Sequence, residues 1–166
     1  AECTEAPYAY NGWMRTHGTL ARAYNALGRH AEAREVCRAA MDGADDADFD
    51  YAVVNLGLQI EFALAEAGLG NFREARQRLQ SLTDKHERNR SPVTLGSLFE
   101  ARARVSMLEK DTASARQHLK RAEELIAPLG IASLTRRVRA LAREIGRQGV
   151  DPNTFSTRPP PAPDSE

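Results

Sequence analysis

The chain has 166 residues, a formal net charge of zero and 42% hydrophobic residues, enough to bury the core of one compact domain. Ala, Leu, Arg and Glu are abundant and only 6% of residues are aromatic, which favours helices and predicts an all-α fold. The zero net charge gives no sign of nucleic-acid or membrane-surface binding, and two cysteines are too few for a disulfide scaffold or a clustered zinc site.

The N-terminus and the most apolar segment carry no targeting or membrane signal. Residues 1–20 lack the basic-then-apolar pattern of a secretory signal, and the apolar run 52–69 is interrupted by Gln59, Glu61 and Glu66. We therefore expect a soluble, cytoplasmic protein. The chain begins with Ala rather than Met, and its many alanines and few lysines are typical of a high-GC bacterial genome, so we expect part of a longer bacterial protein.

The domain organisation follows from composition and helical periodicity. Residues 1–6 are predicted to be a lead-in, residues 7–148 a helical repeat domain and residues 149–166 a proline-rich tail. The first helix is expected from Pro7 to about Leu27. The following helices are expected at about 31–41, 47–69, 72–88, 92–109, 112–127 and 132–148.

The apolar positions of these helices predict which sides face the core. In the first helix one apolar stripe is formed by Trp13, Leu20, Tyr24 and Leu27. In the second helix Cys37 falls at a core position, so we expect a buried free thiol. Core positions of the last two helices are Ala115, Leu119, Ala122 and Ile126, then Leu134, Val138, Leu141 and Ile145.

One turn pattern organises the whole chain. At residues 70–76, Gly70 supplies the left-handed residue that commonly ends a helix, and Asn71 is expected to cap the next helix with Glu74 completing a capping box. The same pattern recurs at residues 28–34 and, in degraded form, at residues 110–116. The recurrence predicts three repeats of a helical pair.

Residues around these turns carry a family resemblance. Leu20, Tyr24, Leu27, Gly28, Ala33 and Ala40 resemble the tetratricopeptide signature, and the resemblance extends over about residues 13–127. It implies an α-α superhelix of seven helices, as three antiparallel pairs and a capping helix. It also implies binding of a peptide or protein partner on the concave face, which the first helix of each pair builds. Similar arrays lie at the ends of large bacterial signalling proteins.

Polar residues on the first helices are the candidates for that concave face. They are Arg15, Arg22, Asn25, Asn55, Gln59, Glu66, Glu100 and Arg104. In the third helix Asn55, Gln59 and Glu66 share one side, where hydrogen bonding between neighbouring helices is an equally good interpretation. The set does not reproduce the two-carboxylate clamp of chaperone-binding family members.

The last helix is strongly basic. Glu144 is its one acidic residue, against the arginines Arg136, Arg137, Arg139, Arg143 and Arg147. Such a helix can meet phosphates or an acidic partner, or it can present the polar outer side that a terminal repeat needs.

No known catalytic or phosphate-binding motif occurs, and the four histidines are scattered. We therefore expect no catalytic residue, metal or cofactor. The expected function is a non-catalytic protein-interaction module of a larger regulatory protein, with homo-oligomers possible. The alternative is a sensory domain that binds a small ligand and controls an unseen output domain; an enzyme is a distant third.

The tail from Val150 to Glu166 is expected to lack a fixed structure, because it offers little apolar area to offset the entropy of ordering. If it is ordered, we expect Phe155 to anchor it in an apolar notch and residues 159–163 to lie extended against a helical face.

Overall fold

The computed structural model describes residues 6–42, 52–88 and 90–148, and within these ranges the chain is all-α. The described helices are α1 (Ala6–Ala26), α2 (His30–Asp42), α3 (Ala52–Gly68), α4 (Phe72–Glu87), α5 (Pro92–Leu108), α6 (Thr112–Ile126) and α7 (Ala132–Gln148), with a short 3-10 turn at Ala127–Leu129. The expected helix ends agree to within one residue, except that the expected start of the third helix at residues 47–51 lies outside the described residues. The predicted tail also lies outside them.

The three predicted turns share one geometry. Gly28, Gly70 and Lys110 have positive φ angles of 71°, 86° and 65°. Each turn also has a hydrogen bond from the following amide to the carbonyl five residues before it, as from Arg29 to Tyr24 at 2.9 Å. The turns therefore repeat at the backbone level, and Lys110 adopts a conformation that favours glycine.

The helix N-terminal caps differ between α5 and α4. The Ser91 hydroxyl accepts a hydrogen bond from the Thr94 amide, as a cap should. The Asn71 side chain makes no cap hydrogen bond, so the predicted capping box with Glu74 is wrong. The Asn71 amide group instead donates to Glu66 Oε2 at 2.6 Å, and this charge-assisted hydrogen bond holds the side chain against the preceding helix.

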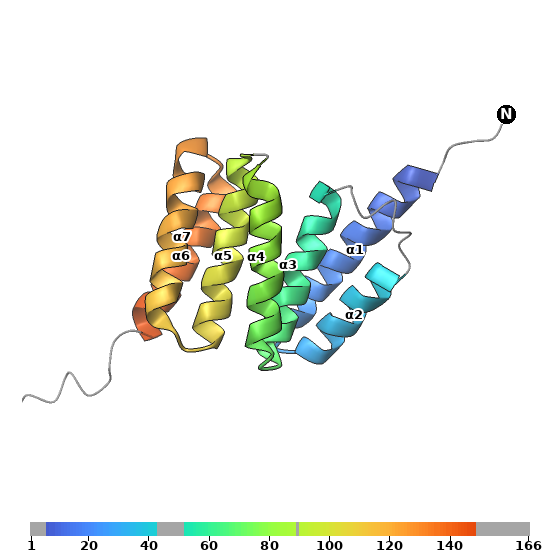
Figure 1. Cartoon of the computed structure of the whole chain (residues 1–166), viewed down its shortest axis with the longest axis horizontal. Coiled ribbons are helices and arrows are strands. Elements are labelled where there is room, and N and C mark those ends of the chain that lie inside the picture. Colours follow the sequence, from blue (N-terminus) through green and yellow to red (C-terminus); the bar gives the residue numbers. More distant parts are fainter. Residues whose placement is uncertain (1–5, 43–51, 89, 149–166) are drawn as a thin grey trace, which may run out of the picture.

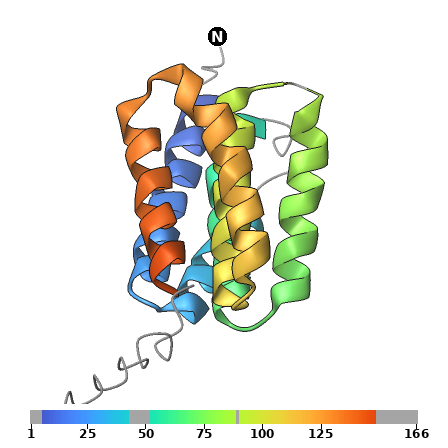
Figure 2. The same ribbon diagram turned by 90° about the vertical axis from the view of Figure 1, so that its left-hand side faces the viewer.

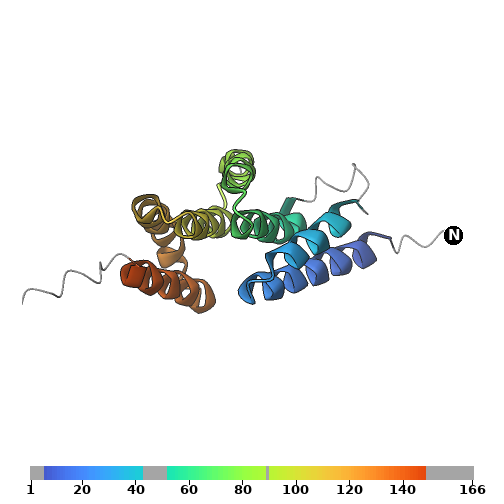
Figure 3. The same cartoon turned by 90° about the horizontal axis from the view of Figure 1, so that it is seen from below.

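The helices stack so that one side of the array is hollow. Neighbours in the chain pack together (Figure 1), and α1 also packs on α3, α3 on α5, and α5 on α7. Seen from below, α3 and α5 lie side by side in the middle, with α4 on one side and with α1 and α7 on the other (Figure 3). The side view agrees, placing α4 on the face opposite to α7 and α1 (Figure 2). The two outer helices therefore border the face floored by α3 and α5.

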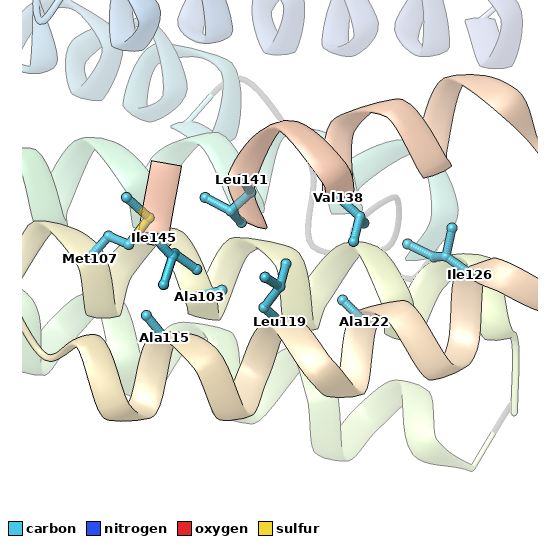
Figure 4. Close-up of a cluster of buried hydrophobic side chains, with 9 residues drawn as sticks. All are labelled: Ala103, Met107, Ala115, Leu119, Ala122, Ile126, Val138, Leu141 and Ile145. Atoms are coloured by element: carbon cyan, nitrogen blue, oxygen red, sulfur yellow. The ribbon is translucent and has the colours of Figure 1, made fainter. Parts of the chain in front are cut away.

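The core consists of three neighbouring clusters of buried side chains. The cluster between α5, α6 and α7 is drawn in Figure 4, and its members are Ala103, Met107, Ala115, Leu119, Ala122, Ile126, Val138, Leu141 and Ile145. The core positions predicted for the sixth helix are all buried, and so are those of the seventh except the half-buried Leu134. None of the described helices is both long enough and apolar enough to cross a membrane.

Helix α1 packs differently from the sequence expectation. Its buried side chains include Met14 and Ala21, while Trp13, Leu20 and Leu27 of the predicted apolar stripe are 39%, 42% and 70% exposed. Small residues face α3 because the backbones approach closely: a methyl group added at Gly18 would contact the α3 backbone. Of the predicted stripe, only Tyr24 is partly buried and packs against the core, whereas the other three residues are exposed.

The expected buried thiol is present between α2 and α3. Cys37 is buried without a disulfide, and its Sγ lies 3.7 Å from the Leu58 carbonyl as a weak donor. Burial, followed by the nearby Glu61 carboxylate, raises the pKa of the Cys37 thiol to about 12. The thiol is therefore protonated and unreactive at neutral pH.

Candidate functional site

The hollow face contains an open pocket of about 650 Å³ that we call the central groove. Helices α1, α3, α5 and α7 contribute most of its lining, and α2 contributes its first residue, His30. Its polar lining residues are Arg22, Asn25, His30, Glu61, Glu100, Arg104, Arg137, Glu144 and Gln148, and its large apolar ones are Ile60, Leu64, Met107, Leu108 and Leu141. The groove is thus polar at its sides and apolar in part of its floor.

The side of the groove between α1 and α3, the N-terminal wall, is built on one buried carboxylate. Glu61 Oε1 accepts a hydrogen bond from Arg22 Nε at 2.8 Å. The Asn25 amide donates to the Glu61 carbonyl at 2.9 Å and to Glu61 Oε2 at 3.2 Å. Asn25 Oδ1 lies 3.1 Å from His30 Nδ1, which links the wall to α2. One arginine therefore neutralises one carboxylate here.

His30 is held closely against α3. A methyl group added at Gly68 would overlap the His30 ring, so only glycine lets the two helices meet at this point. The absence of a side chain at Gly68 therefore helps to shape the N-terminal wall.

The side between α5 and α7, the C-terminal wall, is also built on a buried carboxylate but has two cations. Glu100 is 1% exposed, and its Oε1 accepts hydrogen bonds from Arg104 Nη2 at 2.9 Å and Nε at 3.2 Å. Arg137 Nη2 lies 2.6 Å from Glu100 Oε2, as an ion pair that lacks hydrogen-bond alignment. The Arg104 and Arg137 side chains are 40% and 44% exposed.

At the C-terminal wall two arginines share one glutamate, and this leaves N–H donors that a ligand could use. Two guanidinium groups carry more N–H donors than one carboxylate can accept, and the surplus donors of Arg104 and Arg137 face water or a ligand. Arginine presents its donors in a planar fork that matches a carboxylate or a phosphate. This wall can therefore accept a second anionic group without displacing Glu100.

Four of the predicted binding residues line the central groove. Arg22 and Asn25 come from α1, and Glu100 and Arg104 come from α5. Arg15 lies outside it, at a separate hollow of about 310 Å³ between α1 and α3.

Three polar residues of α3 do not lie in the groove. The prediction that Asn55 and Gln59 border one surface with Arg22 is wrong, because both side chains are buried. Gln59 Oε1 accepts from Arg78 Nη1 at 2.7 Å, so it serves the alternative role of bonding neighbouring helices. The carboxylate of Glu66 is used locally by Asn71.

The arginines of the basic helix, α7, lie on two sides of it. Arg137 faces the groove, whereas the other four arginines are exposed: Arg136, Arg139, Arg143 and Arg147. Of these, Arg143 and Arg147 border a shallow hollow on α7 itself. The capping interpretation fits the exposed arginines, and Arg137 belongs to the site.

Sequence reasoning missed the groove residues of α3. Ile60, Glu61 and Leu64 share one helix side, at i, i+1 and i+4, and this spacing was the available signal. It is hard to detect because α3 is apolar on most of its circumference, so that no single side stands out.

The described residues show no arrangement typical of metal binding. They contain no group of three or more His, Cys, Asp or Glu side chains that could hold a metal ion. Of the histidines, His86 and His118 have pKa values lowered mainly by burial, and neither lines the central groove.

Comparison with family models, curated proteins and solved structures finds no match for this chain. The evidence for a repeat architecture therefore comes from the internal recurrence of the sequence and from the packing of the helices.

Proposed function

We propose that this chain is a non-catalytic protein-interaction module, a tetratricopeptide-like array that binds a segment of a partner protein in the central groove. The observation that carries the proposal is the C-terminal wall, where half-exposed Arg104 and Arg137 share one buried carboxylate. The three turns of common geometry support the comparison with tetratricopeptide repeats.

The shape of the groove favours a segment of polypeptide. Its lining extends from α1 to α7, and Ile60, Leu64 and Met107 supply apolar contacts between the polar walls. Apolar contacts supply affinity, while a few placed polar groups fix orientation. A peptide with an apolar side chain next to an acidic one matches this arrangement.

The charges favour an acidic side chain at one position only. At the N-terminal wall Arg22 is matched by Glu61, and Glu144 places a further negative charge on α7. The charges of the groove lining balance overall, but Arg104 and Arg137 both pair with the same carboxylate, Glu100, so their remaining N–H donors are where we expect the acidic side chain of the partner to bind. Such charge-assisted hydrogen bonds are the stronger ones.

The test uses a phage-displayed library of random peptides, selected on the intact chain. The affinity of the selected peptides is then measured by calorimetry for wild type, Arg137→Gln and Arg139→Gln. Both variants remove one arginine from α7, but only Arg137 faces the groove. We expect Arg137→Gln to weaken binding about tenfold or more and Arg139→Gln to leave it unchanged.

The two variants also show which results would contradict the proposed function. Thermal unfolding followed by circular dichroism checks that both remain folded. Equal loss of affinity in both variants would show that the net charge of α7, not the groove, attracts the peptides. Selected peptides without any acidic residue would contradict the charge argument.

The size of the groove also supports a second function, binding of a small ligand by a sensory domain. About 650 Å³ lies within the usual range of small-molecule pockets, roughly 300 to 1,000 Å³. A thermal-shift screen with small carboxylates and phosphates distinguishes the two functions. Stabilisation that requires Arg137, together with a failed peptide selection, would favour the sensory domain.

A further inference from the structure

A second hollow lies on the side of α5 that faces away from the central groove. It has a volume of about 320 Å³, and residues of α4, α5 and α6 line it. We call it the rear pocket; its polar lining residues are Arg76, Gln77, Gln80, Arg102, Ser106 and His118. None of them lines the central groove. Arg102 and Arg104 are two residues apart, which places them on nearly opposite sides of α5, so the two hollows are separate.

Arg102 brings a partly buried positive charge to the rear pocket. Its guanidinium carbon lies over the Phe99 ring, 5.5 Å from the centroid, but within the described residues the group makes neither a hydrogen bond nor an ion pair. Burial lowers the pKa of Arg102, and the carboxylates of Asp84 and Glu87 on α4 offset only part of this effect. The charge is therefore less well stabilised than in water, and an anion in the pocket would supply a partner for it.

Ser106 supplies a buried hydroxyl to the same pocket. The residue is only 5% exposed and lines the hollow, yet its hydroxyl has no hydrogen-bond partner among the described residues. Buried polar groups are nearly always hydrogen-bonded, so a buried hydroxyl without a protein partner beside a hollow indicates a bound molecule. Ser106 follows Arg102 by four residues, so both lie on the same side of α5.

Two further groups add hydrogen-bond donors from the neighbouring helices. Burial and then the charge of Arg102 lower the pKa of His118 on α6, although Asp111 acts in the opposite sense. The imidazole is therefore neutral at neutral pH, and one ring nitrogen carries a proton to donate. Arg76 on α4 pairs with Glu109 and keeps further N–H donors. Among the described residues no carboxylate lines the rear pocket, so its lining favours an anion.

We propose that the rear pocket binds a phosphate monoester, and that Arg102 and Ser106 donate hydrogen bonds to its phosphate oxygens. A phosphate group offers three acceptor oxygens, which suits donors that come from several helices. The volume of about 320 Å³ lies at the lower end of the usual range for small-molecule pockets, roughly 300 to 1,000 Å³. It leaves room for a small organic group, which Leu79 and Val105 of the lining would contact. This site does not depend on the central groove.

The test is an NMR titration of the intact chain with glycerol phosphate and with inorganic phosphate, at constant pH and ionic strength. The ring signals of His118 report on the rear pocket and those of His30 on the central groove. We expect a saturable shift of the His118 signals that is tighter for glycerol phosphate. The affinity is then compared in Arg102→Gln and Arg116→Gln, since Arg116 on α6 is exposed and lies outside the pocket. Arg102→Gln should weaken binding about tenfold or more, and Arg116→Gln should leave it nearly unchanged.

A second variant keeps the proposal testable if Arg102→Gln fails to fold, which circular dichroism would show. Ser106→Ala removes only the hydroxyl and should weaken binding about two- to tenfold. His118 signals that neither ligand shifts, including a case in which only His30 responds, would overturn the proposal. So would an affinity that Arg102→Gln and Ser106→Ala both leave intact. An equal loss in Arg116→Gln would also overturn it, because net charge and not the pocket would then attract the phosphate.

Discussion

Helices α1 and α7 border the same groove from opposite sides, and their inner sides are alike. Each places an arginine over a buried glutamate of the neighbouring floor helix, Arg22 over Glu61 and Arg137 over Glu100. Their outer sides differ, because α1 exposes the large apolar side chains of Trp13 and Leu20 and α7 exposes arginines. The likeness reflects the shared groove, and the difference gives the two helices outer surfaces of opposite chemical character.

The two helices also differ in how they are attached to the array. Helix α7 buries the large side chains Val138, Leu141 and Ile145, whereas the buried described residues of α1 are Met14 and the small Gly18 and Ala21. Burial of large apolar side chains is the main source of stability in such packing. The comparison therefore predicts unequal effects of the same substitution in the two helices.

The largest expected effect is at Leu141. Leu141→Ala should lower the free energy of unfolding by about 2 to 5 kcal/mol, because Leu141 is buried between α5, α6 and α7. Leu20→Ala should change it by less than about 0.5 kcal/mol, because Leu20 is largely exposed. Urea unfolding measures both. Equal losses would remove the distinction between the two helices.

The second-largest expected effect is on the free energy of unfolding when the buried glutamate of either wall is replaced. Glu100→Gln is expected to cost about 1 to 2 kcal/mol, since it removes charge-assisted bonds to two arginines that are themselves partly solvated. Glu61→Gln should cost less than about 1 kcal/mol, because its one arginine partner is mostly exposed. The same urea series measures both variants. A larger cost at Glu61 would contradict the unequal charge of the two walls.

The third comparison is between the equivalent turns at Gly28 and Lys110, where substitutions should change the free energy of unfolding by about 1 kcal/mol. Lys110→Gly should stabilise the chain by roughly that amount, because Lys110 has a positive φ that costs a residue with a side chain. Gly28→Ala should destabilise it by a similar amount for the same reason, since nothing lies close enough to clash with the added methyl group. Thermal melts of both variants test this. A destabilised Lys110→Gly or a stabilised Gly28→Ala would show that the turns are not equivalent.

The smallest expected effect is the pH dependence of the part of the array next to α7. Burial, followed by the Arg102 charge, lowers the pKa of His118 on α6. The unfolded chain therefore binds more protons as the pH falls below about 6.5, and stability that is present above this pH is lost below it. Wild type should be less stable at about pH 5.5 than at about pH 7.5, and His118→Gln should reduce that difference. If His118→Gln shows the same difference in stability between the two pH values as wild type, that difference arises from other groups, such as His86.

Helix positions and turns could be predicted from the sequence because their signals are local. Gly28 and Gly70 end helices through their own backbone freedom, and the regular spacing of Leu119 and Ile126 marks a single buried side. These features depend little on distant parts of the chain.

The sides of α1 and α3 could not be predicted in the same way, because they depend on where neighbouring helices lie. In α1, close approach to α3 selects small residues such as Gly18 and leaves Leu20 outside. In α3, neighbours on more than one side bury Gln59 with a hydrogen-bond partner and leave Glu61 facing the groove. Hydrophobicity alone does not contain this information.

The most direct test of the central claim, that the groove is the binding surface, is an NMR titration with the tightest peptide from the library. The Nε–H groups of Arg22 and Arg104 donate to the buried glutamates and report on the two walls, while Arg76 on α4 pairs with Glu109 outside the groove. We predict large shifts of the Arg104 signal, smaller shifts at Arg22 and none at Arg76. Shifts at Arg76 with unchanged signals from Arg22 and Arg104 would contradict the claim.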